Sequence, residues 1–152
     1  MHELFASEQI DHWLFGGWAV DFYVGSVTRP HDDIDFAVWL DDLPRIRELL
    51  AAHEWKHAPE PDEDGGTGYE RRGVRLELTF LVRDADGEIF IPLRDRRAPW
   101  SADALGYDVR ELLGVQARLI SLATLIHGKS TPRDEPKEAA KDRADYRVLS
   151  QL

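Results

Sequence analysis

The amino-acid sequence predicts an α/β (α+β) fold, in which helices pack on a mixed β-sheet. Within a predicted strand at 74–82, residues 74–80 alternate between apolar and polar side chains, a pattern typical of a half-buried strand. Segments with strand and helix periodicity follow one another along the chain, separated by Gly, Pro and Asp turns. A chain of 152 residues, 43% of them hydrophobic, is long enough to form one domain with its own core. We therefore predict a single domain over residues 1–152.

The first part of the chain contains two predicted strands that each lead into a helix. Gly16-Gly17 ends the first strand, and Gly25 is the expected C′ residue of the short helix that follows. Asp41-Asp42 can cap the next helix, whose first turn tolerates Pro44. The predicted elements are an amphipathic helix at 3–13, a strand at 13–15, a helix at 18–24, a strand at 33–40 and a helix at 43–53.

The remaining chain is predicted to add further strands and two terminal helices. Residues 84–87 have turn chemistry and connect the strand at 74–82 to a return strand at 88–92. Ser121 can cap one helix, and Pro136 fits the first turn of the last one. We further expect a loop at 59–68, an irregular segment at 94–108, a strand at 115–120, and helices at 122–127 and 135–149. Residues 109–152 then form a C-terminal strand-helix-helix segment of the same domain.

Two carboxylates stand one residue apart at the start of the strand at 33–40. Because side chains at i and i+2 of a strand share a face, Asp33 and Asp35 should lie about 6–7 Å apart. At an effective dielectric constant of about 20, unit charges at that separation repel by about 2–3 kcal/mol. No Lys or Arg lies between them, and oxygen ligands on a rigid strand suit Mg²⁺. The sequence therefore predicts a metal site at Asp33 and Asp35.

A glycine pair precedes this strand. Gly16 and Gly17 follow an apolar strand and would let backbone N–H groups come close to a phosphate. A glycine pair alone is usually just a turn. Here a spacer of fifteen residues, 18–32, separates it from the Asp-x-Asp strand. The combination indicates a nucleotide-binding turn.

A two-metal phosphoryl-transfer site usually needs a third carboxylate from a neighbouring strand. Glu77 is the candidate, because it lies between Leu76 and Leu78 and shares its face of the strand with Arg75. The competing interpretation is that Glu77 only forms a cross-strand ion pair with an arginine. Glu70, on the preceding strand, is the rival position for the third carboxylate.

At these residues the chain resembles the nucleotidyltransferase superfamily of the DNA polymerase β type. The signature of that superfamily is a Gly-Gly or Gly-Ser turn followed by Asp-x-Asp on the next strand. Gly16-Gly17-Trp18 and Arg29-Pro30-His31-Asp32-Asp33-Ile34-Asp35 resemble motifs of the small antibiotic nucleotidyltransferases, namely the aminoglycoside 2''-adenylyltransferases and the short lincosamide enzymes. The motif covers residues 14–38, and the order of the later elements fits the same mixed-sheet nucleotidyltransferase fold over most of the chain.

This resemblance implies Mg²⁺ as cofactor and ATP or another NTP as co-substrate. It implies that Asp33, Asp35 and Glu77 are catalytic residues and metal ligands, with Glu77 as ligand or general base. The residues implied in nucleotide binding are Gly16, Gly17, Arg29, His31 and Lys129. Arg29 would bind the triphosphate through its fork-shaped guanidinium, whereas His31 could equally orient Asp33 by a hydrogen bond.

Three lysines near the C-terminus, Lys129, Lys137 and Lys141, are candidate phosphate ligands. Lys141 also stands four residues before Asp145, so the two could simply pair on a solvated helix face.

The net charge of −10 argues against a general nucleic-acid binder, which needs a basic groove. It suits a small cation better, although acidic surfaces also keep proteins soluble. The chain has no cysteine, which excludes disulfides and thiolate metal sites. No apolar run approaches the length of a membrane span, and the N-terminus lacks the pattern of a signal peptide. We expect a cytoplasmic protein without a membrane partner.

The expected function is Mg²⁺-dependent transfer of a nucleoside monophosphate from an NTP to a hydroxyl of a small acceptor. AMP is the first candidate for the transferred group. The acceptor is expected to be cationic, such as an aminoglycoside or lincosamide. Two alternatives stay open: a toxin or regulator that modifies tRNA or protein, and a non-catalytic binding module of the same fold. A homodimer could complete the acceptor pocket. The acceptor is expected between the metal site and the acidic loop residues Glu60, Asp62, Glu63, Asp64, Asp84, Asp86 and Glu88.

Overall fold

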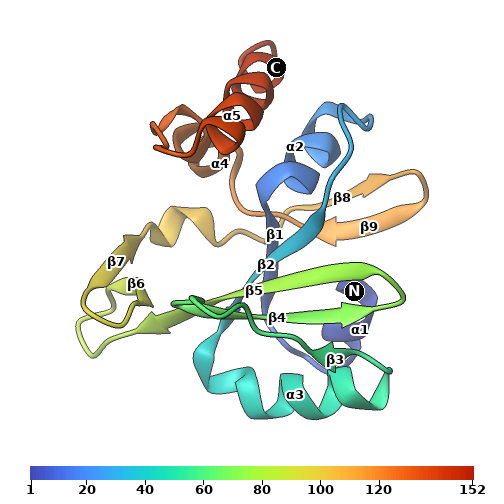
Figure 1. Cartoon of the computed structure of the whole chain (residues 1–152), viewed down its shortest axis with the longest axis vertical. Helices are drawn as coiled ribbons and strands as arrows, with labels where there is room; N and C mark the ends of the chain where they lie inside the picture. Colours follow the sequence, from blue (N-terminus) through green and yellow to red (C-terminus); the bar gives the residue numbers. More distant parts are fainter.

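The computed structural model describes residues 1–152 and is built around a mixed β-sheet (Figure 1). The main strand order is β1-β2-β5-β4-β3, and β6 and β7 continue the sheet from β5. The strands are β1 (His12–Phe15), β2 (Asp33–Trp39), β3 (Lys56–His57), β4 (Gly66–Arg71), β5 (Val74–Arg83), β6 (Ile89–Pro92), β7 (Arg97–Trp100), β8 (Val109–Leu112) and β9 (Val115–Arg118). The helices are α1 (His2–Ser7), α2 (Gly16–Val24), α3 (Leu43–Ala52), α4 (Leu122–Ser130) and α5 (Pro136–Leu149), with short 3₁₀ turns at Leu40–Asp42 and Ala102–Ala104.

The register of the central strands brings three chain segments together at one place. β2 runs parallel to β5, which aligns Asp35 with Glu77. β1 runs antiparallel to β2, which aligns Phe15 with Asp35. Because Gly16 follows Phe15 directly, the glycine turn, the start of β2 and the start of β5 meet there. Figure 1 shows α4 and α5 beside α2 at one end of the molecule and α3 at the other.

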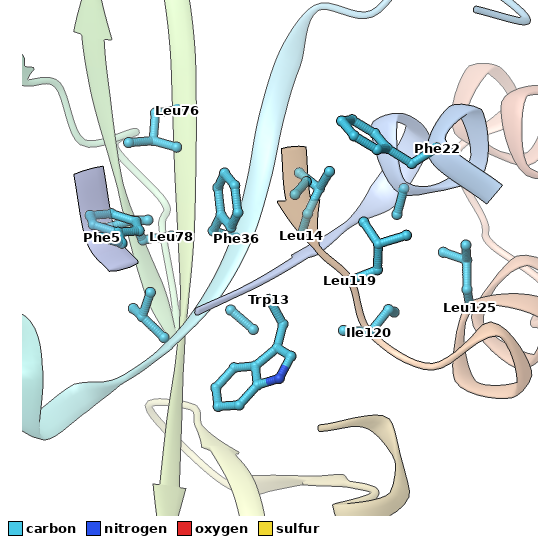
Figure 2. Packing of buried hydrophobic residues seen from close by; sticks show 14 of the residues in the cluster. Phe5, Trp13, Leu14, Phe22, Phe36, Leu76, Leu78, Leu119, Ile120 and Leu125 are labelled. Atoms are coloured by element: carbon cyan, nitrogen blue, oxygen red, sulfur yellow. The ribbon is translucent and has the colours of Figure 1, made fainter. Parts of the chain in front are cut away.

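The core forms where the apolar faces of these strands meet the first helices. Figure 2 shows Phe36 of β2 and Leu76 and Leu78 of β5 packed beside Phe5 of α1 and Leu14 of β1. All five side chains are buried, and burying one such side chain contributes about 1.5–3 kcal/mol. The alternation that buries Leu76 and Leu78 turns Glu77 to the opposite face of β5, away from the core.

Most of the predicted elements are confirmed. Gly25 adopts a left-handed conformation, with φ of 82°, and ends α2. Gly87 has φ of 85° in the turn before β6. The Ser121 hydroxyl accepts a hydrogen bond from the Thr124 amide at the start of α4. None of the helices combines the length and the apolarity that crossing a bilayer requires.

Several predicted boundaries are wrong, mainly where strands lack a clear pattern. The helix predicted at 3–13 ends at Ser7, because the chain must turn to place residues 12–15 in the sheet. The loop predicted at 59–68 ends before β4, and the irregular segment 94–108 contains β7. Residues 109–152 form a hairpin followed by two helices, since β9 pairs with an unpredicted β8. Asp42 does not cap α3, because its carboxylate accepts a hydrogen bond from Arg45 instead.

His12 is a buried histidine that stays neutral in the folded protein. It is 2% exposed, and its Nδ1–H donates to the carbonyl of Ile10 at 2.7 Å. Its Nε2 accepts from His2 at 2.7 Å. Burial lowers the pKa of His12 to about 4, and the nearby His2 and Arg118 act in the same direction.

We predict that protonation of His12 destabilises the protein in mild acid. The unfolded chain takes up this proton near its ordinary pKa of 6.5, and the folded chain only near 4. The stability contribution is therefore lost as the pH falls through that window, by up to about 3 kcal/mol. Urea unfolding from pH 7 to pH 4 should show a shallower pH dependence for His12→Gln than for the wild type. Equal slopes for the two proteins would contradict this assignment.

Candidate active site

A cavity of about 690 Å³ lies between the sheet and the C-terminal helices. The glycine turn, the start of β2, Glu77 of β5, and α4 and α5 all contribute to its wall. The predicted catalytic and nucleotide-binding residues all line this cavity, namely Gly16, Gly17, Arg29, His31, Asp33, Asp35, Glu77 and Lys129. Of the other two candidate phosphate ligands, Lys141 lines it and Lys137 does not. Other charged residues along the wall are Asp32, Arg133, Glu138 and Lys141.

The glycine turn packs directly against the charged residues of the site. Gly16 has φ of 69°, a conformation that side chains other than glycine rarely adopt. A Cβ atom at Gly16 would collide with the carboxylate of Asp35. A Cβ atom at Gly17 would collide with the side chains of Arg29 and His31. The two missing side chains therefore let the turn approach both the acidic and the basic parts of the cavity.

Asp35 carries a charge that the protein does not balance. Burial, followed by repulsion from Asp33 and Glu77, raises the pKa of Asp35 to about 7. Lys129 and Arg133 act in the opposite direction and offset only part of this effect. A carboxylate in that situation is stabilised when a cation arrives.

The donor set at Asp33 and Asp35 fits a Mg²⁺–nucleotide complex better than a metal bound by protein alone. No group of three His, Asp or Glu side chains converges closely enough to hold an ion without further ligands. Mg²⁺ usually takes one or two carboxylates from the protein and completes its octahedron with substrate phosphates and water. Two neighbouring carboxylates beside a glycine turn match this arrangement.

Glu77 lines the cavity but already has a partner. The Nε–H of Arg75 donates to Glu77 Oε1 at 2.5 Å, so the competing ion pair does form, although along one strand and not across two. Burial raises the pKa of Glu77, whereas Arg75 acts to lower it. Glu70, the rival candidate, is 58% exposed at its side chain and does not line the cavity.

The basic residues of the cavity are held in place by buried carboxylates. The Arg29 guanidinium forms two parallel hydrogen bonds of 2.9 Å to Asp145 on α5. Lys129 on α4 contacts Asp145 at 2.8 Å and Asp142 at 2.9 Å. His31 lies 2.6 Å from the buried Asp21 and 3.1 Å from Arg29. His31 therefore orients Arg29, and it does not contact Asp33 as the alternative interpretation expects.

Sequence reasoning missed the carboxylates of α5. Asp142 and Asp145 are buried, so the alternative interpretation, in which Lys141 and Asp145 pair on a solvated helix face, is wrong. Lys141 instead contacts Asp32 and Glu138. The spacing of Asp142, Asp145 and Leu149 along one helix face is the signal that could have revealed their burial.

The acidic loop residues do not contribute to the cavity. None of the acids between Glu60 and Asp64, or between Asp84 and Glu88, lies along its wall. Asp84 follows β5 at the end opposite Glu77, where it accepts hydrogen bonds from the amides of Asp86 and Glu88. The acids that do face the cavity are Asp32, Asp33, Asp35, Glu77 and Glu138.

Comparison with known families matches residues 1–146 to a family described as aminoglycoside-2''-adenylyltransferase. A 2''-aminoglycoside nucleotidyltransferase from Klebsiella pneumoniae is 45% identical over 38 residues. That stretch covers 23% of this chain and only 22% of the relative.

Two solved structures share the fold. The lincosamide antibiotic adenylyltransferase LnuA, solved with lincomycin bound, superimposes with a TM-score of 0.74 at 19% identity, covering 97% of this chain and 90% of LnuA. ANT(2'')-Ia in complex with adenylyl-2''-tobramycin gives a TM-score of 0.66 at 19% identity, covering 98% of this chain and 83% of that chain. The mixed sheet with its helices is thus the nucleotidyltransferase fold predicted from the sequence.

We predict that Asp35→Asn stabilises the protein in the absence of metal and nucleotide. The folded pKa of about 7 lies above the ordinary 3.8, so ionised Asp35 costs stability at neutral pH. The neutral amide should raise the free energy of unfolding at pH 8 by about 2–4 kcal/mol. The gain should shrink as the pH falls from 7 toward 4, because folded Asp35 is then protonated and the unfolded carboxyl approaches its own pKa of 3.8. Urea unfolding in EDTA measures both effects, and a less stable variant would refute the charge assignment.

Asp145→Asn should have the opposite effect. It leaves Arg29 and Lys129 without their shared counter-charge in a buried setting, which typically costs about 3–5 kcal/mol. Asp32→Asn is the matched control, because its carboxylate is 73% exposed where it meets Lys141. We expect the control to lose little stability, because an ion pair in solvent is screened. Similar losses in the two variants would show that the Asp145 pairs are not special.

Proposed function

The chain belongs to the aminoglycoside-2''-adenylyltransferase family, and from this premise we propose that it is a nucleotidyltransferase acting on a small molecule. The proposed reaction moves a nucleoside monophosphate, AMP in the first instance, from an NTP to a hydroxyl of a cationic acceptor such as an aminoglycoside or a lincosamide. Pyrophosphate leaves. We propose the cytoplasm as its location and no membrane or nucleic-acid partner.

One observation carries this proposal: two adjacent carboxylates without a protein cation face a cavity whose cations are all anchored. Asp33 and Asp35 would hold Mg²⁺ together with phosphate oxygens of the nucleotide. When bound, the ion would neutralise charge on the triphosphate and favour displacement at the α-phosphorus. The remaining groups of the cavity bind and orient the nucleotide.

The residues around the turn have distinct proposed roles. Backbone N–H groups of Gly16 and Gly17 can donate to phosphate oxygens. Arg29 and Lys129 present positive charge to the triphosphate from positions fixed by Asp145, and His31 contacts Arg29 from its place beside Asp21. This preorganised field requires no rearrangement when the nucleotide arrives.

Glu77 is proposed to act on the acceptor side. Arg75 engages only its Oε1, so Oε2 remains available to the second metal position or to the acceptor hydroxyl. In the transfer, the acceptor oxygen forms a bond to the α-phosphorus while the bond to the pyrophosphate oxygen breaks. The hydroxyl proton passes to Glu77.

The acceptor is proposed to be a cation for reasons of local charge. The five acids along the cavity wall outnumber its four Lys and Arg residues, and the chain carries a net charge of −10. A field of that sign attracts an amino sugar or a similar base and repels RNA. LnuA and ANT(2'')-Ia were solved with lincomycin and an adenylylated tobramycin, respectively. Helices α4 and α5 supply one wall of the cavity within this chain, so a homodimer is not needed to enclose it.

We predict Mg²⁺-dependent transfer of label from α-labelled ATP to an aminoglycoside or a lincosamide. Asp33→Asn and Asp35→Asn should each reduce transfer to background, because the metal loses half of its protein ligands. Asp84→Asn removes an equal charge at the far end of β5 and should leave transfer unchanged. Raising the salt from 0.1 to 1 M should weaken acceptor binding, since the Debye length falls from about 10 Å to about 3 Å.

Two results would overturn this proposal. Label found on tRNA but not on small cations would favour the toxin-like alternative. Full activity in Asp35→Asn would remove the metal site from the mechanism.

A further inference from the structure

Arg75 lies just behind the cavity wall and is enclosed by acceptors. Its Nε–H donates to Glu77 Oε1 at 2.5 Å, and its Nη1 donates to the carbonyl of Ala58 at 2.7 Å. Its Nη2 lies 3.3 Å from a carboxylate oxygen of Glu60, and its Nη1 lies 3.5 Å from one of Glu70. The side chain is 16% exposed, and it does not line the cavity itself.

The neighbouring strand provides the space that this guanidinium occupies. Gly68 on β4 is the register partner of Glu77 on β5. A Cβ atom at Gly68 would collide with the guanidinium of Arg75 and would lie 2.9 Å from the carbonyl of Ala58. Only glycine at this position leaves room for the guanidinium of Arg75. The binding position of this guanidinium, called its seat below, is therefore formed by β4, β5 and the loop before β4.

This seat decides where the Glu77 carboxylate can lie. On its other side Glu77 is aligned with Asp35, and their like charges repel. Without a fixed partner, the flexible Glu77 side chain would turn away from the aspartate pair. Arg75 holds Oε1, whereas Oε2 has no hydrogen-bond partner, and Glu77 lines the cavity.

We propose that Arg75 is a positioning residue for nucleotidyl transfer, which holds Glu77 so that its free oxygen meets the acceptor hydroxyl. This inference rests on the proposed function and deepens it. Arginine suits the role because its planar fork can contact Glu77, Ala58 and Glu60 at once, which a lysine ammonium on a flexible stem cannot do. Arg75 touches neither the nucleotide nor the acceptor, so it acts only through Glu77.

The kinetic test compares Arg75→Met, Arg75→Lys and Glu77→Gln in the label-transfer assay. Displacing a catalytic group by about 1 Å can cost about 100-fold in rate, so Arg75→Met should lower kcat by about 10- to 100-fold. The KM for ATP should change by less than about twofold, because the nucleotide side of the cavity is untouched. Arg75→Lys should restore only part of kcat.

A double-mutant cycle tests whether Arg75 acts through Glu77. In the Glu77→Gln background, Arg75→Met should have almost no further effect on kcat. Independent, additive losses would overturn the proposal, as would a wild-type kcat in Arg75→Met. If the wild type transfers no label to any acceptor, the proposed function fails and this inference fails with it. If the wild type transfers label but the Arg75 variants do not show the expected loss of kcat, only this inference is wrong, and the proposed function is unaffected.

A second cycle needs no activity. Gly68→Ala should lower the urea midpoint by about 0.5 M or more in the wild type, because its methyl group displaces the guanidinium. In Arg75→Met the same change should cost clearly less, since the flexible methionine can yield. Gly106→Ala is the control, because a Cβ atom there meets only open space and the Asp108 amide at 3.9 Å. An equal cost of Gly68→Ala in both backgrounds would show that Arg75 has no such seat.

Discussion

The parallel alignment of Asp35 on β2 with Glu77 on β5 is the constraint to which the surrounding structure responds. Together with Asp33, it gathers negative charge at a partly buried place where carboxylates are poorly solvated. The protein answers in two ways. Glu77 receives a dedicated arginine, whereas the aspartate pair receives none. Because Glu77 is paired and Asp33 and Asp35 are not, this part of the cavity favours binding of an external cation. A triphosphate can carry that cation into the site.

On the opposite side of the cavity lie positive charges, and each is paired with a negative group of the protein. The cations along its wall, Arg29, Lys129, Arg133 and Lys141, each contact a carboxylate of the protein. The carboxylates that hold Arg29, Lys129 and Arg133 are buried on α5, whereas Lys141 meets the exposed Asp32. The cost of orienting these long side chains is met during folding and not during binding, which is the sense in which such a site is preorganised.

Local sequence patterns were enough to predict the fold class, the glycine turn and the carboxylates of the two central strands, whereas Arg29, His31 and Lys129 were implied by the family resemblance. Strict alternation located β5, the i, i+2 rule placed Asp33 and Asp35 on one face, and the glycine pair located the turn. Three features depend on contacts that no local pattern encodes. β4 contains Gly66 and Gly68, poor strand formers, because a side chain at either position would meet β5. β7 and β8 are short strands defined by their partners, and Asp145 meets Arg29 across 116 residues. Long-range pairing of this kind becomes visible only once the chain is folded.

The distance in sequence between Arg29 and Asp145 affects the order in which parts of the cavity can form during synthesis on the ribosome. The turn, both aspartates and Glu77 are synthesised by residue 77 of 152, and the central strands can pair as soon as β5 has emerged. Arg29 remains without its bidentate partner until residue 145 has left the exit tunnel. Until residues 84–145 have been made, the cavity lacks the wall that α4 and α5 supply. Assembly of α5 onto α2 and α4 is the step that turns a folded sheet into a complete cavity.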